Sequence, residues 1–180
     1  MLRVTYFTHS TTTDNERGIA TGWQPGELSS RGREQATNLA AQLASTSFGA
    51  VYSSDQQRAF ESAKLFFGAD CLVIQDARLR ECNYGDFTGR PADGFMPRLV
   101  DYIEAPFPGG ECYRDVERRV SAFLDDLQQR HEGASVAIVA HQAPQLAFEV
   151  LLAGKTWQQA IEQDWRSAGA WQPGWVYEVA

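Results

Sequence analysis

Apolar residues along the chain fall into two patterns that alternate with each other. Short apolar-rich runs, typical of strands in a buried sheet, are found at 2–8, 50–53, 71–74, 135–140 and 175–179. Longer segments between them carry apolar residues three and four positions apart, as amphipathic helices do. Because strands that alternate with helices form mostly parallel sheets covered on both faces, the sequence predicts a three-layer α/β/α sandwich.

Start and stop signals bound the first two predicted helices. The first follows Ser29 or Ser30, since either hydroxyl can cap it. Its apolar face consists of Ala36, Leu39, Ala40, Leu43 and Ala44. The second follows Ser54 or Asp55 as its cap and ends at Gly68. Its apolar face consists of Ala59, Phe60, Ala63, Phe66 and Phe67.

The second half of the chain contains one long helical pattern, at 112–131. Its apolar face consists of Val116, Val120, Phe123, Leu124 and Leu127. Shorter helices are predicted at 97–104, at 144–152 with Pro144 in the first helical position, and at 157–165.

Long loops connect these elements. The segment 76–94 is punctuated by glycines, and long loops inside compact domains are often functional. We expect specificity to be set by loops 10–26, 84–110 and 153–172. Four tryptophans lie in or after the last of these, and we favour core packing or a dimer contact for them over a stacking surface for an aromatic substrate. They are Trp157, Trp165, Trp171 and Trp175.

Composition limits the class of protein. A chain of 180 residues with 43% hydrophobic content fits one domain, 1–180. The formal net charge of −7 argues against a general nucleic-acid or anionic-membrane binder, but a local positive pocket for a phosphorylated substrate remains compatible with it. No apolar run approaches the roughly 20 residues of a membrane span. The N-terminus lacks a signal-peptide pattern, so a cytoplasmic protein is expected.

The three cysteines, Cys71, Cys82 and Cys112, lack a CxxC spacing. They therefore indicate reduced thiols rather than a disulfide framework or a zinc site, and no metal is expected.

Two histidines follow predicted strands. His9 comes after 2–8 and His141 after 135–140, and side chains at the carboxyl ends of parallel strands converge on one crevice. Histidine is also readily poised as a nucleophile or proton carrier. Arg58 lies at the start of a helix after a strand, which is the geometry of an anion site. Glu81 is either a solvated loop carboxylate or a proton donor to a leaving oxygen.

The order and spacing of these residues resemble the histidine phosphatase superfamily, also called phosphoglycerate mutase-like, over almost the whole chain. The matching positions are His9, Asn15, Gly22-Trp23, Leu28, Gly32, Glu34-Gln35-Ala36, Tyr52-Ser53-Ser54-Asp55, Arg58-Ala59, Glu61-Ser62-Ala63, Leu79-Arg80-Glu81, Asn83, Gly85, Pro108-Gly109-Gly110-Glu111 and His141. The resemblance implies a phosphoglycerate mutase-like fold, no cofactor and phosphatase activity.

The resemblance also implies roles for individual residues. His9 is the nucleophile that forms a phosphohistidine, and Arg58 with a charged His141 forms the phosphate pocket. Glu81 protonates the leaving group and then deprotonates the attacking water. Asn15 donates one further hydrogen bond to the substrate. Glu111 either helps to hold the site in place or forms a salt bridge.

The chain departs from the family at its first motif. The family begins Arg-His-Gly, whereas this chain reads Thr8-His9-Ser10. Thr8 offers a hydrogen bond without charge or a bidentate fork, and losing one such donor costs about 10² to 10³ in rate at other sites. Thr8 and Ser10 are still expected to bind substrate. Loop arginines could replace the missing cation, and the sequence does not rank them. They are Arg17, Arg80 and Arg90.

Two neighbouring segments bear on the same pocket. For the hydroxyl run Ser10 to Thr13 we favour a solvated loop over a phosphate-lining role. Gln142-Ala143-Pro144 stands where relatives usually carry small glycines, which would narrow the pocket.

Two functions follow as hypotheses. The first is a metal-independent phosphomonoesterase, monomeric or homodimeric, that acts on a small phosphorylated metabolite through a phosphohistidine at His9. The alternative, motivated by Thr8, is a catalytically weakened family member that binds a phosphorylated ligand or a protein partner.

Overall fold

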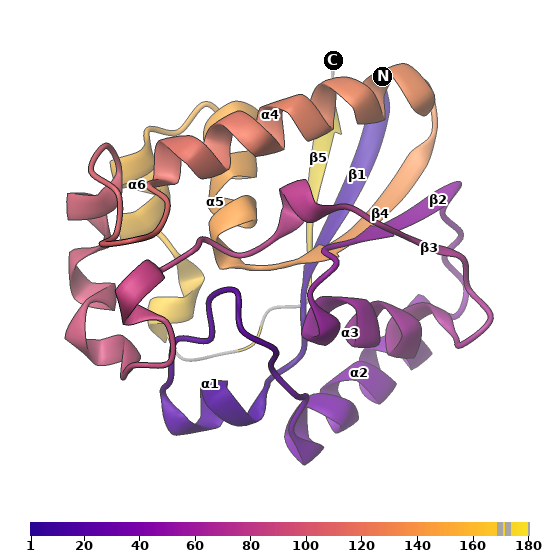
Figure 1. Cartoon of the computed structure of the whole chain (residues 1–180). Coiled ribbons are helices and arrows are strands. Elements are labelled where there is room, and N and C mark those ends of the chain that lie inside the picture. The colour runs from indigo at the N-terminus through magenta and orange to yellow at the C-terminus, as the bar shows by residue number, and fades with distance from the viewer. Residues whose placement is uncertain (169–170, 172–173, 180) are drawn as a thin grey trace.

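The computed structural model describes residues 1–168, 171 and 174–179. Its described part forms one five-stranded sheet in the order β3-β2-β4-β1-β5 (Figure 1). The strands are β1 (Leu2–Thr8), β2 (Ala50–Ser53), β3 (Val73–Gln75), β4 (Ser135–Ala140) and β5 (Gly174–Val179). The first four are parallel, and β5 runs antiparallel to β1.

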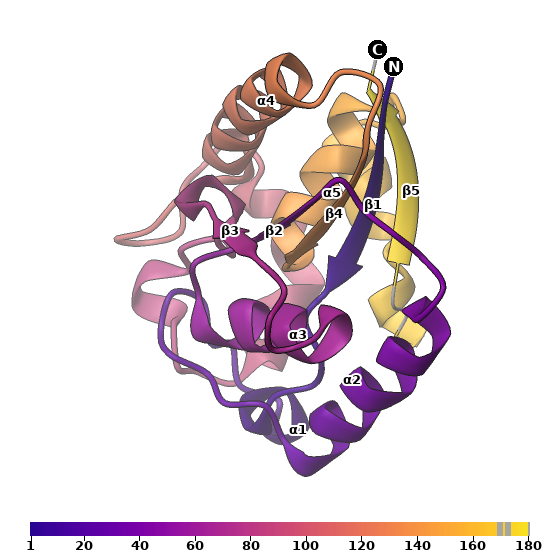
Figure 2. The same cartoon turned by 90° about the vertical axis from the view of Figure 1, so that its right-hand side faces the viewer.

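Helices cover both faces of the sheet, as the alternating pattern predicted (Figures 1 and 2). On one face, α2 (Ser30–Leu43) and α3 (Gln57–Phe67) pack on a small core that includes Phe7 and Val139. On the other, α4 (Tyr113–Arg130), α5 (Gln142–Leu151) and α6 (Trp157–Glu162) share the larger core. Successive strand residues point to opposite faces, which gives the three layers of the sandwich.

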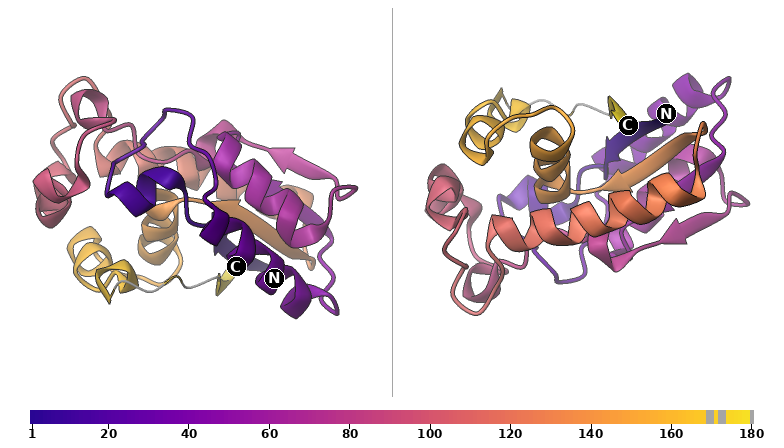
Figure 3. Two further views of the ribbon diagram at one scale, coloured as in Figure 1. Left: turned by 90° about the horizontal axis from the view of Figure 1, so that it is seen from below. Right: turned by 90° about the horizontal axis from the view of Figure 1, so that it is seen from above.

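The pairing of β1 with β4 fixes the edge where the candidate residues lie. Thr8 is opposite Ala140, so the two parallel strands end together. The His9 N–H continues the ladder by donating to the Ala140 carbonyl at 2.9 Å. Seen from below, α1 (Thr13–Arg17) lies beyond this end of the sheet (Figure 3). At the other end of β1, Leu2 pairs with Val179 of the antiparallel strand β5.

The predicted cap of the second helix is wrong. The Ser54 Oγ accepts the N–H of Gln56, the residue before the helix, at 3.2 Å, and the Asp55 carboxylate is bound to Arg80. Both residues are therefore engaged elsewhere, and α3 begins after Gln56. The end at Gly68 is confirmed, with a positive φ of 98° at that glycine.

Other boundaries shift for local reasons. A turn in which the Cys71 N–H bonds the Gly68 carbonyl delays β3 to Val73–Gln75. Helix α5 begins at Gln142 with His141 as its N-cap, so Pro144 occupies the third position rather than the first. Proline is tolerated there because first-turn N–H groups have no partner within the helix.

The connecting segments contain more structure than the sequence indicated. The predicted loop 10–26 contains α1, which Thr12 caps. The predicted helix at 97–104 is a 3-10 helix at Met96–Tyr102. The segment predicted as one helix at 157–165 is divided into α6 and a separate 3-10 helix, η5 (Trp165–Ala168). No helix in the described residues is long and apolar enough to span a bilayer.

Ser29, rather than Ser30, is the cap of α2. Its Oγ accepts the Gly32 N–H at 3.1 Å and donates to the Thr11 carbonyl at 3.3 Å. Ser29→Ala should therefore lower the free energy of unfolding by about 0.5–2 kcal/mol in urea denaturation. Ser30→Ala, at an exposed helical position, is the matched control and should stay within about 0.5 kcal/mol of wild type. Equal effects of the two substitutions would contradict this assignment.

Candidate active site

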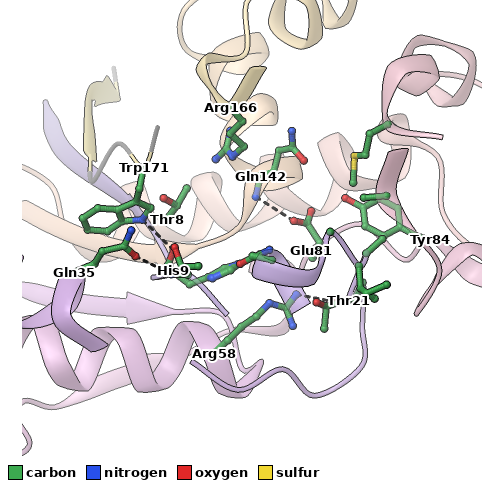
Figure 4. A pocket seen from close by; sticks show the side chains of 18 of the residues that line it. Thr8, His9, Thr21, Gln35, Arg58, Glu81, Tyr84, Gln142, Arg166 and Trp171 are labelled. Carbon is green, nitrogen blue, oxygen red and sulfur yellow. Dashed lines mark hydrogen bonds between the residues drawn. The ribbon is translucent and has the colours of Figure 1, made fainter. Parts of the chain in front are cut away.

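A pocket of about 390 Å³ opens at the carboxyl end of β1, where the predicted crevice was expected. It is walled by the segment after β1, the start of α2, the Glu81 loop, the start of α5 and the η5 region (Figure 4). The polar and aromatic lining residues are Thr8, His9, Thr11, Asn15, Thr21, Arg31, Gln35, Arg58, Glu81, Tyr84, Gln142, Trp165, Arg166 and Trp171.

His9 is held in one tautomer. Its Nδ1 lies 2.8 Å from the Ser10 carbonyl oxygen, which can only accept, so Nδ1 carries the proton. The other nitrogen, Nε2, keeps its lone pair. Burial, together with the positive charge of Arg58, lowers the pKa of His9 from 6.5 to about 3. The ring is therefore neutral at neutral pH, which is the form a nucleophile requires.

The His141 ring lies beside the His9 ring, with 5.1 Å between the ring centroids. The buried Tyr6 hydroxyl fixes its backbone by donating to the His141 carbonyl at 2.8 Å and accepting its N–H at 3.1 Å. Both ring nitrogens are buried and lack a hydrogen-bond partner among the described residues.

The expectation of a charged His141 lining the pocket is wrong for this structure. The ring is fully buried and is not part of the pocket lining. Burial lowers its pKa well below the usual value, and the nearby Arg58 and His9 lower it further. The neutral form of the His141 imidazole is therefore favoured, mainly because burial removes the ring from water and also because the Arg58 charge is close to it.

Arg58 enters the pocket from α3 and is only 2% exposed. Its Nη2 donates to the Gly22 carbonyl at 2.8 Å, and its Nη1 donates to the Gln24 carbonyl at 3.2 Å. Gln56 Oε1 accepts a longer bond from Nη2 at 3.4 Å. These carbonyls hold the guanidinium in a fixed direction, which confirms the position predicted for Arg58 in the pocket.

Glu81 is held by backbone N–H groups. Its Oε1 accepts from Cys82 and Ala143 at 2.9 Å each, and its Oε2 accepts from Gln142 at 3.2 Å. Two of these donors belong to the first turn of α5, where the helix dipole also favours an anion. Glu81 is therefore a fixed pocket carboxylate rather than a solvated one, and Gln142 lines the pocket beside it, as expected.

The loop that carries Glu81 is tied to α4 by Arg119. The Arg119 guanidinium donates to the carbonyls of Arg78 and Arg80 at 2.7 Å and of Glu81 at 3.0 Å. Glu111 pairs with Arg119 at 3.0 Å and accepts the Asn83 N–H, so both roles considered for Glu111 are present. Sequence reasoning missed Arg119, because an arginine on the polar side of a helix carries no distinguishing signal.

The residues around His9 divide between the pocket and the interior. Thr8 and Asn15 line the pocket, as predicted for substrate contacts. Ser10 does not: it is fully buried, and its backbone N–H bonds Ser62 Oγ at 3.0 Å. Thr12 is also buried and caps α1, so the solvated-loop interpretation of this hydroxyl run is wrong for these two residues.

None of the arginines proposed to replace the missing cation lines the pocket. Arg80 is paired with Asp55 at 2.5 Å, and Arg90 lies over the Phe87 ring. Arg17, the third candidate, is also outside the pocket lining. The pocket cations besides Arg58 are Arg31, on α2, and Arg166, on η5.

The tryptophans divide in the same way. Trp157 is buried against Tyr113, as core packing predicted. Trp165 and Trp171 instead line the pocket, which corrects the preference for packing or a dimer contact at these two positions. Trp171 Nε1 donates to the His9 carbonyl at 3.3 Å.

All three cysteines are free thiols. Within the ranges that the structure describes, no group of three or more His, Cys, Asp or Glu side chains is arranged to hold a metal ion.

The sequence is similar to those of known protein families and relatives. The pattern of the histidine phosphatase superfamily (branch 1) matches residues 7–169. Phosphoserine phosphatase 1 of Hydrogenobacter thermophilus is 29% identical over 163 residues, which cover 86% of this chain and 77% of that protein. The adenosylcobalamin/alpha-ribazole phosphatase of Escherichia coli is 29% identical over 150 residues, covering 78% of this chain and 74% of its own.

Solved structures are similar over most of their length. Bacillus stearothermophilus YhfR superposes with a TM-score of 0.79 at 28% identity, covering 89% of this chain and 84% of its own. A mycobacterial glucosyl-3-phosphoglycerate phosphatase in complex with VO3 gives a TM-score of 0.78 at 27% identity, covering 90% of this chain and 87% of its own.

The lowered pKa of His9 makes stability depend on pH. Between pH 6.5 and about 3, the unfolded chain binds a proton at this ring and the folded chain does not. The free energy of unfolding should therefore fall as pH falls through this window, by up to about 1.4 kcal/mol per pH unit for this group. Urea denaturation at pH 7 and pH 5 should show wild type losing about 2 kcal/mol more than His9→Asn. Equal losses in the two proteins would show that the His9 ring titrates normally.

Proposed function

The chain belongs to the histidine phosphatase superfamily (branch 1), and on that premise we propose that it is a metal-independent phosphomonoesterase that acts on a small phosphorylated metabolite. One observation carries the proposal: a neutral His9, fixed through Nδ1, lines the same pocket as the buried Arg58 guanidinium. Phosphoserine and alpha-ribazole phosphatases among the relatives support phosphoric monoester hydrolysis as the reaction class.

In the proposed first step, His9 Nε2 attacks the phosphorus atom. The N–P bond forms as the P–O bond to the leaving group breaks, and the leaving oxygen takes a proton from the protonated Glu81 carboxyl. The Ser10 carbonyl, which accepts from Nδ1–H at 2.8 Å, stabilises the positive charge that the ring acquires. Arg58 faces the charge spread over the phosphoryl oxygens, as phosphoryl transfer requires.

In the proposed second step, water hydrolyses the phosphohistidine. The Glu81 carboxylate accepts a proton from the water as its oxygen attacks phosphorus, and the electron pair of the N–P bond returns to His9 Nε2. Phosphate leaves, and both residues regain their starting forms. The backbone N–H groups of Cys82, Gln142 and Ala143 keep the carboxylate in one place through both steps. Such fixed geometry is the main contribution a protein makes to this reaction.

Thr8 supports a second candidate function. Thr8 lines the pocket at the position where the family carries an arginine. β1 therefore contributes no guanidinium to bind the phosphoryl group. A member weakened in this way would bind a phosphorylated ligand without efficient turnover. The two candidates differ in one observable, which is whether bound ester is hydrolysed.

The first test compares wild type with His9→Ala on a panel of phosphate monoesters in excess chelator. Phosphate release should survive chelator and be abolished in His9→Ala, because no other group in the proposal forms the N–P bond. His131→Ala is the matched control, since that ring bonds Tyr52 at 2.8 Å and is not part of the pocket lining. Undiminished turnover in His9→Ala would exclude the proposed nucleophile. A silent panel with folded protein that binds phosphate would favour the non-catalytic candidate.

The second test examines Glu81 through the leaving group. Glu81→Gln should lower kcat by about 10² to 10⁴ for alkyl phosphates, whose leaving oxygen needs a proton. The loss should be much smaller for phosphorylation of the enzyme by p-nitrophenyl phosphate, whose leaving group departs as a stable phenolate. Burst-phase kinetics measure that step separately from hydrolysis. The same loss with both ester types would show that Glu81 does not act as the acid.

A further inference from the structure

The pocket contains an arginine whose hydrogen-bonding capacity is only partly used. Arg166, on η5, lines the pocket with a side chain that is 22% exposed. Its Nη2 is buried and has no hydrogen-bond partner among the described residues. A buried guanidinium N–H without a partner is costly, so such groups usually have a role that the protein alone does not display.

The rest of the Arg166 guanidinium is firmly positioned. Nη1 donates to Asp164 Oδ1 at 2.8 Å and to Gln145 Oε1 at 3.2 Å. Its planar group lies over the Trp165 and Trp175 rings, at 4.8 and 5.8 Å from their centroids. These contacts leave Nη2 as the guanidinium nitrogen that has no hydrogen bond and is shielded from solvent, while the side chain as a whole keeps a fixed direction at the pocket.

Gln145 extends this support into the core. Its Nε2 donates to the Tyr177 hydroxyl at 3.0 Å, and that hydroxyl donates to Glu149. Gln145 itself is buried in α5. Arg166 is therefore anchored to both α5 and β5, although it lies on a short 3-10 helix.

Arg166 faces the place where the phosphoryl group is expected. In Figure 4, Arg166 and Arg58 enter the pocket from opposite sides, with His9 and Glu81 between them, and Thr8 lines the same pocket. The positive charge of Arg166 also reaches both histidine rings, where it contributes to the lowered pKa of His9 and of His141. Asp164 pairs with this charge at 2.8 Å, and the contribution of Arg166 to each lowered pKa is smaller than those of burial and Arg58.

A second donor without a partner lies next to Arg166 in the chain. Trp165 Nε1 is buried and has no hydrogen-bond partner among the described residues, and Trp165 also lines the pocket. Two neighbouring residues of one short helix thus each carry a buried N–H donor that no described residue satisfies.

We propose that Arg166 supplies the phosphoryl-binding cation that position 8 lacks, with its guanidinium donating to the phosphoryl oxygens from the side opposite Arg58. The inference rests on the proposed function and extends it: the chain keeps two guanidinium groups at the phosphate, one of which comes from the C-terminal region instead of β1. Arg166 would then touch the substrate, and the departure at Thr8 would be a relocation of charge rather than a loss.

Inorganic phosphate and p-nitrophenyl phosphate test this inference, because neither carries a second anionic group. Arg166→Ala should raise the Ki of inorganic phosphate about 10- to 100-fold and lower kcat/KM for p-nitrophenyl phosphate at least as much. Arg166→Lys should recover part of both values, since it keeps the charge but not the fork. Arg17→Ala, an arginine outside the pocket lining, is the matched control and should change neither value.

A rescue experiment separates a lost contact from a damaged loop. Thr8→Arg in the Arg166→Ala background should restore most of the phosphate affinity, because the new side chain returns the cation to the same anion. In wild type, Thr8→Arg should give a much smaller gain or a loss, since two guanidinium groups then compete for one position. Equal gains in both backgrounds would show independent sites and overturn the inference. An unchanged Ki of phosphate in Arg166→Ala would overturn it as well.

The outcomes also distinguish this inference from the proposed function. Turnover that His9→Ala abolishes but Arg166→Ala leaves intact would reject the inference and keep the phosphatase. Calorimetric binding of inorganic phosphate does not depend on turnover. If wild type hydrolyses no ester but its phosphate affinity falls in Arg166→Ala, Arg166 binds the anion and the proposed catalysis is wrong.

Discussion

The parallel pairing of β1 with β4 is the constraint on which the rest of the site depends. Thr8 and Ala140 are opposite each other in the ladder, so the next residue of each strand is a histidine at the same edge of the sheet. The ring centroids of His9 and His141 are 5.1 Å apart as a result. A slip of one residue in register would move one histidine to another face, and buried apolar side chains on both faces of these strands oppose such a slip.

Backbone groups hold the remaining candidate residues around this pair. Carbonyls of the segment after α1 direct Arg58, and N–H groups at the start of α5 hold Glu81. Backbone is a rigid support, because its position is fixed by whole elements rather than by one rotamer. β4 leads through His141 directly into α5. One short segment therefore positions both a histidine ring and backbone N–H groups that bind Glu81.

Electrostatics in the pocket differ from those of the whole chain. The protein is acidic, with a formal net charge of −7, yet Arg58 and Arg166 face a common cavity that also contains Arg31. Local charge is set by which side chains converge and not by their sum over the sequence. Burial, together with the charge of Arg58, lowers the pKa of His9 and of His141, and thereby favours the uncharged form of both rings beside a guanidinium.

The sequence by itself determined the layered fold, the helix at 112–131 and the placement of His9 and Arg58 at one end of the sheet, because apolar periodicity and strand-end placement are local signals that burial enforces. Glu81 was placed at the same site only by the resemblance to the family. The tertiary structure alone decided that Ser29 caps α2 and that Ser10 is turned into the interior. It also decided that His141 is buried, with a lowered pKa. Finally, it decided that Arg166, and none of the three loop arginines considered from the sequence, lines the pocket. Each of these depends on a contact between distant segments. Nothing in the spacing around Arg166 indicates that η5 would line the same pocket as Thr8, since that placement depends on contacts of Arg166 with Gln145 of α5 and Trp175 of β5.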